Sequence, residues 1–541
     1  RPKEGLNTTN NDRYLRRWWE CDLNYTKFDA LSSAEAASSG ATWFACQKGG
    51  SYRKWFGNNE YVVNWRGDGE EIKATVIARY GSASKRVVNE HLYFKEGITW
   101  SSISSSALSM RHVPSGQIFE TKGNMCFFET EVELFKGLAF CNTCIVNPLI
   151  KCVSPTLDFH AGPVGKLPIA AGVDEEVISI AKNAVVIGTA DWNAYERSWG
   201  FQYFPLLTAS FGSMQSLESS YSAWITQNRE TIAKLISLEE ENNRLFIDAY
   251  GLADELTPEV PIEQITLTLN PAYRYGIKNT EEERNIRFRE NTMEELVSSA
   301  VGCMMGRYSL DEPGLIYANS GNEGFDLLVE QGAYKVFPAD DDGIIPLTDK
   351  EWFADDAANR LVEFISVAWD RDHLEENLSF LAANLSPKKG EDSRDTIRRY
   401  LCDKFYKDHM QTYKKRPIYW LFSSGKQKAF QCLVYLHRYN ESTLARMRTE
   451  YVIPLTAKLS SHIEKLENDK GASGSAAEIK KLEKEIKNLH KQQTELTEFD
   501  EKLKHYADMR IPLDLDDGVK VNYGKFGDLL SDVKAIHGKA V

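Results

Sequence analysis

The chain has 541 residues and a formal net charge of −13, and at roughly 100–200 residues per domain this length allows about three or four domains. It has no apolar run near the roughly 20 residues of a membrane span, and no apolar stretch behind a charged start as in a signal peptide. Nine cysteines, an odd number, argue against a disulfide-rich secreted scaffold. We therefore expect a soluble cytoplasmic protein that makes no membrane contact. Because the sequence starts with Arg1 and not Met, we also expect a fragment or a processed chain.

The first domain is predicted to span residues 1–170 and to contain many short strands. Residues 11–29 have aromatic side chains and arginines near helical spacing, which predicts an entry helix. Residues 52–65 have two strand-like runs on either side of Gly57, Asn58 and Asn59, which predicts a β-hairpin.

Residues 95–128 place polar and cationic side chains among β-branched and aromatic ones. Ile98, Trp100 and Ile118 can bury one side of short strands. The other positions supply hydrogen-bond donors and acceptors, from Thr99, Ser101, Ser102, Arg111, Gln117, Lys122 and Asn124. Such a face suits the reading of base edges, because bases present fixed donor and acceptor patterns in the major groove. Composition also leaves open an ordinary β-domain with serine-rich turns.

Helical patterns dominate the rest of the chain. We predict a helical spacer over residues 171–260, a mainly helical middle domain over 261–390 and a basic helical domain over 391–541. Apolar residues at three- and four-residue steps on both sides of 471–475 predict an antiparallel helical hairpin, which could clamp DNA or pack back onto its own domain. The predicted fold class is α+β, with a β-rich first domain and an α-helical C-terminal domain.

Positive charge is concentrated between residues 394 and 448. This segment has 13 cations and four anions, a local charge of +9 in an otherwise acidic chain. A localised DNA-facing surface would have this pattern, because a phosphate interacts mainly with charges within about one Debye length, or about 8 Å. A solvated helix face is the alternative, since charge runs often have no other role.

Several short motifs resemble functional sites but lack essential parts. Ser423, Ser424, Gly425 and Lys426 match a fragment of a phosphate loop without its first Gly, which argues against ATPase activity. Cys141 and Cys144 form a single C-x-x-C pair, and we predict no metal site because a zinc site needs a second well-spaced pair. Residues 340–342 are three adjacent aspartates without EF-hand spacing, which favours a solvated turn.

Long stretches of the sequence resemble the target-recognition region of single-chain DNA adenine methyltransferases, most closely the PglX type of the BREX phage-defence system. The first is YRKWFGNNEYVVNW at 52–65, followed by residues 95–128 and by VSPTLDFHAGPVGKLPI at 153–169. The resemblance continues through 415–439 and 499–530 and so covers most of the chain. It implies that residues 1–170 are the recognition domain and that this chain is the C-terminal half of such an enzyme.

The resemblance also implies roles for individual residues. The expected base-reading residues are Thr99, Ser101, Ser102, Arg111, Lys122 and Asn124. Arg111 is the preferred guanine reader, because arginine can donate two bonds to O6 and N7. The expected phosphate contacts are Lys85, Arg86, Arg416, Lys426, Lys428 and Arg438.

We predict no catalytic residues in this chain. Asn270, Pro271, Ala272 and Tyr273 imitate the adenine-binding tetrad N-P-P-Y, but the third residue differs and no Gly-rich cofactor loop precedes them. S-adenosylmethionine is implied for the complete enzyme only, and the missing N-terminal methyltransferase half would bind it. The expected partners are double-stranded DNA, that half, other BREX components and a phage-encoded DNA mimic. A protein-interaction module that docks other defence components is the alternative function.

Overall fold

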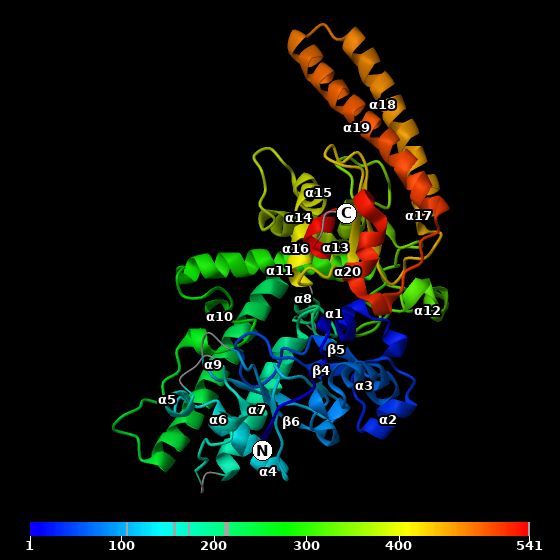
Figure 1. Cartoon of the computed structure of the whole chain (residues 1–541). Helices are drawn as coiled ribbons and strands as arrows, with labels where there is room; N and C mark the ends of the chain where they lie inside the picture. Colours follow the sequence, from blue (N-terminus) through cyan, green and yellow to red (C-terminus); the bar gives the residue numbers. More distant parts are fainter. Residues whose placement is uncertain (104–106, 155–157, 171–173, 210–215, 539–541) are drawn as a thin grey trace. The chain divides into compact units, whose positions relative to one another are not determined.

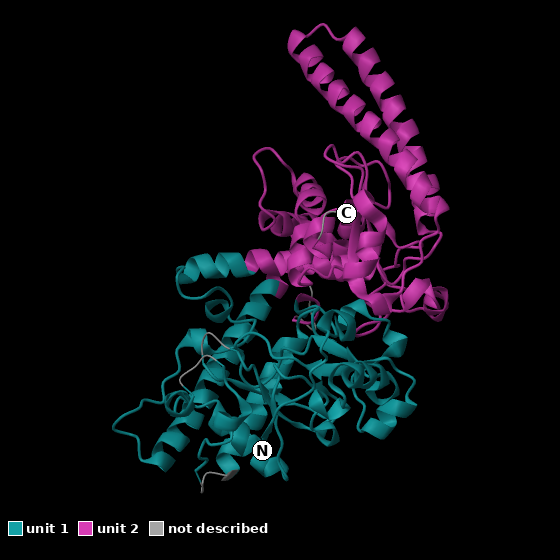
Figure 2. Ribbon diagram, in the orientation of Figure 1, with its two compact units in different colours: residues 1–205, 221–288 teal, residues 206–220, 289–541 magenta. Residues whose placement is uncertain are grey.

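A computed structural model describes residues 1–103, 107–154, 158–170, 174–209 and 216–538. The chain forms two compact units (Figures 1 and 2), which are described separately. Unit 1 comprises residues 1–205 and 221–288, and unit 2 comprises residues 206–220 and 289–541. The predicted boundaries at 170, 260 and 390 stay predictions.

Unit 1 contains two small sheets built from strands of two to five residues. The first has the order β2–β5–β4–β3, with β8 parallel to β4; its strands are β2 (Leu15–Arg17), β5 (Tyr61–Asn64), β4 (Trp43–Gln47), β3 (Thr26–Lys27) and β8 (Ile118–Phe119). The second has the order β1–β9–β6–β7; its strands are β1 (Pro2–Lys3), β9 (Met125–Cys126), β6 (Gly97–Trp100) and β7 (Met110–Val113). All pairs of the second sheet are antiparallel.

The second sheet contributes side chains to two cores, and Val113 of β7 and Met125 of β9 belong to the core around the first sheet. Ile98 and Trp100 belong to the core that is formed with α4 (Glu131–Cys141), α7 (Asp174–Asn193) and α9 (Leu217–Tyr250). The first sheet packs with α2 (Ser33–Ser38) and α3 (Arg66–Tyr80) around a second core. All five residues of β4 are buried.

Two buried ion pairs join the segment before β5 to the helices of unit 1. Arg53 forms an ion pair with Asp191 of α7, and their side chains are 4% and 0% exposed. Asp191 also accepts hydrogen bonds from the amides of Thr268 and Leu269, at 2.8 and 2.9 Å. Lys54 Nζ lies 2.6 Å from Glu239 of α9. Burial at such low exposure is costly for a charged group unless it is paired and hydrogen-bonded, as Arg53 and Lys54 are.

Two predicted elements of unit 1 are wrong. Residues 11–29 do not form one helix: α1 (Asn11–Tyr14) is a single turn, and β2 follows it at once. Residues 52–65 do not form a hairpin, because only Tyr61–Asn64 is a strand and it pairs with β2 and β4. In both segments the pairing partner comes from a distant part of the sequence.

Unit 2 is built around a three-stranded antiparallel sheet of order β10–β12–β11. Its strands are β10 (Ile344–Pro346), β12 (Gln431–Tyr435) and β11 (Tyr419–Ser423), and nearly all of their residues are buried. The larger helices of the unit are the C-terminal part of α11 (Glu281–Met304), α13 (Ala357–Ala368), α14 (Leu374–Ala383), α15 (Ser393–Asp403) and α16 (Phe405–Thr412). Asp392 caps α15, where its carboxylate accepts from the amide of Asp395 at 2.8 Å.

The predicted hairpin is present in unit 2 and is labelled α18 and α19 in Figure 1. Helix α18 (Ile453–Ala472) and helix α19 (Ala476–Asp508) pack along apolar faces, and Ser475 caps the second helix. The buried residues on these faces are Leu455, Leu459, Ile463, Leu466, Ile486, Leu489, Leu496, Phe499 and Leu503. Figure 2 shows the outer ends of both helices extending beyond the rest of unit 2.

The predicted α+β class is confirmed, with a β-rich N-terminal region and a mainly helical C-terminal region. The strands β11 and β12 were not expected in the basic domain. None of the helices in the described ranges is both long and apolar enough to cross a bilayer.

The hairpin gives a first prediction. Leu496→Ala should lower the free energy of unfolding by about 2–5 kcal/mol, because Leu496 is fully buried between the two helices. The matched control Thr497→Ala, at the next and exposed position, should change it by no more than about 0.5 kcal/mol. Urea denaturation followed by circular dichroism measures both values. Equal effects would show that the apolar face does not hold the hairpin together.

The buried ion pair gives a second prediction. Asp191→Asn should destabilise unit 1 by about 3–5 kcal/mol, because Arg53 would stay buried without a counter-charge. Asp248→Asn is the control, because Asp248 pairs with Arg244 on the surface of α9, where such pairs contribute at most about 1 kcal/mol. Hydrogen exchange of the amides around residue 53 measures the local free energy. Unchanged exchange in Asp191→Asn would contradict the proposed contribution of the pair.

Candidate nucleic-acid interface

The six expected base-reading residues lie together in unit 1. Thr99 on β6 faces Arg111 on β7 and Met125 on β9. Thr99 Oγ1 donates to the carbonyl of Asn124 at 2.9 Å, and the amide of Ser102 donates to the carbonyl of Lys122 at 3.2 Å. The sequence positions 99–102, 111 and 122–124 therefore meet on adjacent strands.

Most of this group lies beneath the surface. The exposed fractions of the buried members are 0% for Thr99, 8% for Ser101, 2% for Ser102, 0% for Arg111 and 3% for Asn124. Lys122 alone of the six is exposed. In this conformation five of the side chains offer no surface to a base edge, so a direct reading role would require the segment to open. Their role as base readers stays a prediction.

Arg111 is held inside unit 1 with little compensation for its charge. Its Nη1 donates to the carbonyl of Arg53 at 3.3 Å, and no acceptor among the described residues is bonded to Nε or Nη2. Desolvation, together with the nearby charge of Arg53, lowers the pKa of Arg111 to about 10. Arg111 Nη1 thereby joins β7 to the segment that contains Arg53.

A close backbone contact positions the exposed part of the group. Gly49, at φ +78°, packs so tightly that a Cβ there would lie 2.6 Å from the carbonyl oxygen of Lys122. The Ser101 hydroxyl donates to the carbonyl of Gly50 at 2.8 Å and accepts from its amide at 2.9 Å. Gly50, Ser51 and Lys122 are exposed on this side. We call these three residues the polar tip; of the three, only Lys122 is among the predicted base-reading residues.

The expected phosphate contacts lie in both units. Lys85 and Lys426 are exposed, and the Arg86 guanidinium lies 4.8 Å from the ring centre of Tyr80. Arg416 is half-buried and donates to the carbonyl of Lys415 at 2.9 Å. Lys85 and Arg86 belong to unit 1, and the other four cations belong to unit 2.

Arg438 has a structural environment. It is 1% exposed, donates to Asn322 and to the carbonyls of Asp340 and Asp341, and stacks 3.6 Å from the ring centre of Phe325. Burial lowers its pKa. Contact with a phosphate would require Arg438 to leave these partners, and its assignment as a phosphate contact stays untested.

The basic segment is largely neutralised by its neighbours. At least seven of its 13 cations form ion pairs: Arg394–Glu375, Arg398–Asp356, Arg399–Glu391, Lys404–Glu294, Lys428–Asp403, Arg446–Glu450 and Arg448–Asp500. Six of these seven carboxylates lie outside residues 394–448. The local charge of +9 counted along the sequence therefore overstates the positive charge that this surface presents.

The loop that resembles a phosphate loop already holds an anionic group. Glu495 of α19 accepts from the Ser424 hydroxyl at 2.7 Å, from the amide of Gln427 at 2.7 Å and from the amide of Ala429 at 3.2 Å. The carboxylate thus takes the position that a phosphate would need, while Lys426 beside it is exposed.

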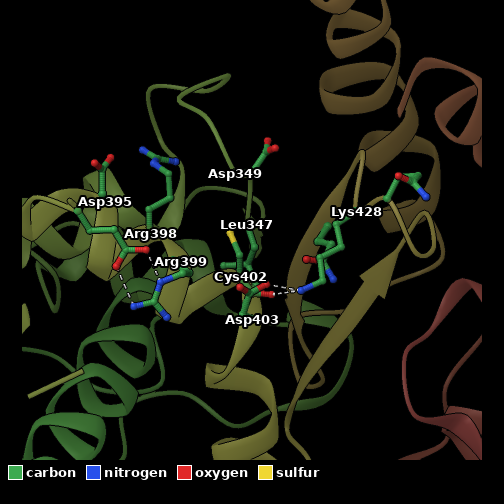
Figure 3. A pocket seen from close by; sticks show the side chains of 11 residues that line it. Leu347, Asp349, Asp395, Arg398, Arg399, Cys402, Asp403 and Lys428 are labelled. Atoms are coloured by element: carbon green, nitrogen blue, oxygen red, sulfur yellow. Dashed lines mark hydrogen bonds and ion pairs between the residues drawn. The ribbon is translucent and has the colours of Figure 1, made fainter. Parts of the chain in front are cut away.

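A pocket of about 380 Å³ lies between α15 and the β11–β12 connection (Figure 3). Its cations are paired, Arg399 with Glu391 and Lys428 with Asp403, as the dashed lines show. Burial raises the pKa of Cys402 to about 12, so its thiol stays protonated at neutral pH. The lining therefore offers neither an uncompensated cationic site nor a thiolate nucleophile.

A second hollow of about 360 Å³ contains the three adjacent aspartates. Asp340 accepts from the amide of Gly343 at 2.7 Å, as in a turn. Burial raises the pKa of Asp342 to about 8, with a further contribution from Asp340, and Tyr451 donates to it at 3.1 Å. Within the described residues, no group of three or more His, Cys, Asp or Glu is arranged to hold a metal ion.

The tetrad-like residues 270–273 form the start of a short helix. Asn270 is 0% exposed and caps α10 (Pro271–Tyr275), where its Oδ1 accepts from the amide of Ala272 at 3.1 Å. Its Nδ2 donates to the carbonyls of Ile262 and Ile265, at 2.7 and 2.9 Å. Both ends of the Asn270 amide are thus bonded within this turn, and its oxygen accepts from the Ala272 amide where an adenine-binding site would need it to accept from the adenine amine.

Comparison with known proteins gives two full-length matches for this chain. It is 46% identical over its whole length to the adenine-specific methyltransferase BrxX of Escherichia coli O9:H4 (strain HS). It is 36% identical over 97% of its length to the adenine-specific methyltransferase PglX of Lacticaseibacillus casei (strain Zhang). No protein-family model matches the sequence.

The chain spans 44% of the length of BrxX and 42% of that of PglX. The two matches cover unit 1, unit 2 and the hairpin together, because they extend over nearly all of the chain. The predicted resemblance to the PglX-type adenine-specific methyltransferases is thus confirmed over at least 97% of the chain, and it covers less than half of each relative.

Proposed function

We propose that this chain is the DNA-recognition part of a site-specific DNA adenine-N6 methyltransferase of a BREX anti-phage system. The whole enzyme would transfer a methyl group from S-adenosylmethionine to one adenine of a short site and so mark host DNA as self. The observation that carries this proposal is the full-length similarity to two adenine-specific methyltransferases that are more than twice as long.

Within the proposed recognition region, the polar tip of unit 1 is the part that is best placed to contact DNA. It exposes a cation, a hydroxyl and a glycine backbone, and all three can bond to phosphate or base edges. Just beneath it, Ser102 Oγ and Asn124 Oδ1 are buried without a hydrogen-bond partner among the described residues. Unsatisfied buried polar atoms cost about 1–3 kcal/mol each, so their clustering favours a functional role for this region.

The residues of this chain do not fit a catalytic role in methyl transfer. An adenine-binding amide must offer acceptors to the exocyclic amine of a flipped base, whereas Asn270 is buried and bonded at both ends of its amide. We therefore assign the binding of S-adenosylmethionine and the flipped adenine to the part of the enzyme outside this chain. Duplex DNA and that methyltransferase part are the proposed partners.

A protein-interaction module is the second candidate. Two observations favour this candidate over a DNA-binding surface. The cations of the basic segment form ion pairs with carboxylates, and five of the six expected base readers are buried. Other BREX components would then dock on unit 2, and a phage-encoded acidic DNA mimic would compete for any remaining cationic surface. Stable co-purification of a defence partner, with no DNA binding at low salt, would support this alternative.

The test of the proposal is binding of the chain to random duplex DNA, followed by selection and sequencing of the bound pool. We expect a steep salt dependence and enrichment of one short asymmetric motif that contains adenine. Lys122→Ala should weaken the binding of this motif, whereas Lys95→Ala, at an exposed position outside the polar tip, should leave it unchanged. No binding at about 50 mM salt would contradict the proposal.

Among the cations that we expect to contact phosphates, the exposed and the buried ones should respond differently to substitution. Lys85→Gln and Lys426→Gln should each reduce the slope of log affinity against log salt by about 0.9, because each side chain is exposed. Arg438→Gln should instead lower the thermal midpoint of unfolding, because it removes a buried side chain with three hydrogen bonds. A reduced slope with unchanged stability in Arg438→Gln would show that this arginine does contact phosphate.

A further inference from the structure

Helix α19 has a row of lysines that the basic segment did not include. Lys480, Lys484, Lys487 and Lys491 are separated by four, three and four residues. At 3.6 residues per turn these positions fall within an arc of about 60° and extend about 16 Å along the helix axis. We call these four residues the lysine row.

The lysine row is exposed and uncompensated. All four side chains are exposed, and none has an ion pair among the contacts of the described residues. The nearby carboxylates point elsewhere: Glu485 pairs with Lys350, and Glu483 acts on Lys470 of α18, whose pKa it helps to raise. Between residues 480 and 491 there are five lysines and two glutamates, a local charge of +3 in a chain of net charge −13.

The orientation of α19 is fixed, so the lysine row cannot turn inward. Ile486, Leu489 and Leu496 bury the opposite face of the helix against α18. On the side toward the sheet, Glu495 is bonded to the 424–429 loop, and Gln492 donates to Asp349 and to the Gln427 carbonyl at 3.3 Å. The row therefore lies on the side of α19 that points away from α18.

We propose that the lysine row binds the phosphate backbone of duplex DNA without reading its sequence. This inference rests on the proposed DNA-recognition function and adds a second, sequence-independent contact surface on unit 2. Lysine provides a point charge on a flexible stem, which suits phosphates and lacks the planar fork that arginine uses on guanine.

Two features of the lysine row favour DNA over a membrane surface as the partner. The row is straight and regular, and a duplex presents one charge per about 1.7 Å of its axis, so several phosphates lie within its reach. The positions that flank the row, Glu483, Asn488 and Thr494, are polar or charged, so this side of α19 lacks the apolar residues that insert into a lipid surface.

The experiment measures the salt dependence of DNA binding by the full 541-residue chain with all four lysines of the row changed to Gln. The slope of log affinity against log salt should fall by about 3–4 units, since each neutralised phosphate contributes about 0.9. Affinity should fall equally for all sequences, and the motif selected from random DNA should not change. The corresponding change of all four lysines to Arg should keep the wild-type slope.

The matched control changes four exposed lysines of unit 2 outside the hairpin and the basic segment, Lys335, Lys388, Lys389 and Lys534, to Gln. It alters the net charge by the same amount and should keep the wild-type slope. Circular dichroism and thermal unfolding of every variant verify that the fold is intact.

The outcomes separate this inference from the proposed function. Wild-type binding with the same slope in the lysine-row variant would overturn the inference and leave the proposed function standing. An equal loss in the control variant would show a net-charge effect and would also overturn it. A changed motif would mean that the row reads bases, contrary to the proposal. Absence of wild-type DNA binding at about 50 mM salt would overturn both.

Discussion

The structure of unit 1 depends on two buried cations whose desolvation is compensated by ion pairs with carboxylates of two helices. Arg53 and Lys54 are adjacent in sequence and pair with two different helices, α7 through Asp191 and α9 through Glu239. The same segment contacts Arg111 through the carbonyl of Arg53 and residues 266–268 through the hydroxyls of Thr266 and Thr268. A segment without regular secondary structure thereby fixes the strands of the candidate interface against the helices behind them.

The long helices could be predicted from sequence, whereas the short strands could not. The helical pattern of residues 171–260 and the apolar period of the hairpin extend over many turns, and α9, α18 and α19 lie where these patterns predict helices. Residues 11–29 have a similar local pattern, yet β2 forms there because β5 supplies a partner almost 50 residues away. Pairing over such distances leaves little trace in the local sequence, and tertiary contacts outweigh helix propensity.

In the candidate site, too, the sequence does not predict which side chains are buried and which are exposed. Thr99, Arg111 and Asn124 lie near one another because the strands that contain or flank them are close in sequence and pair directly. The sequence does not indicate that Arg111 and Thr99 face inward while Lys122 faces outward, since this depends on how the strands pack. The charge of residues 394–448 likewise appears free until the carboxylates of Glu294, Glu375 and Asp500 are placed beside it.

The contact between Glu495 and the 424–429 loop has a consequence for any small anion that meets this protein. A tethered group competes at an effective concentration in the millimolar range or above, because it never diffuses away from its site. Free phosphate or sulfate at ordinary cellular levels therefore faces an internal competitor that already satisfies the amides of Gln427 and Ala429. The loop has the amide donors that bind anions, but the carboxylate of Glu495 already occupies them. Free anions are therefore excluded by this carboxylate and not by the shape of the loop.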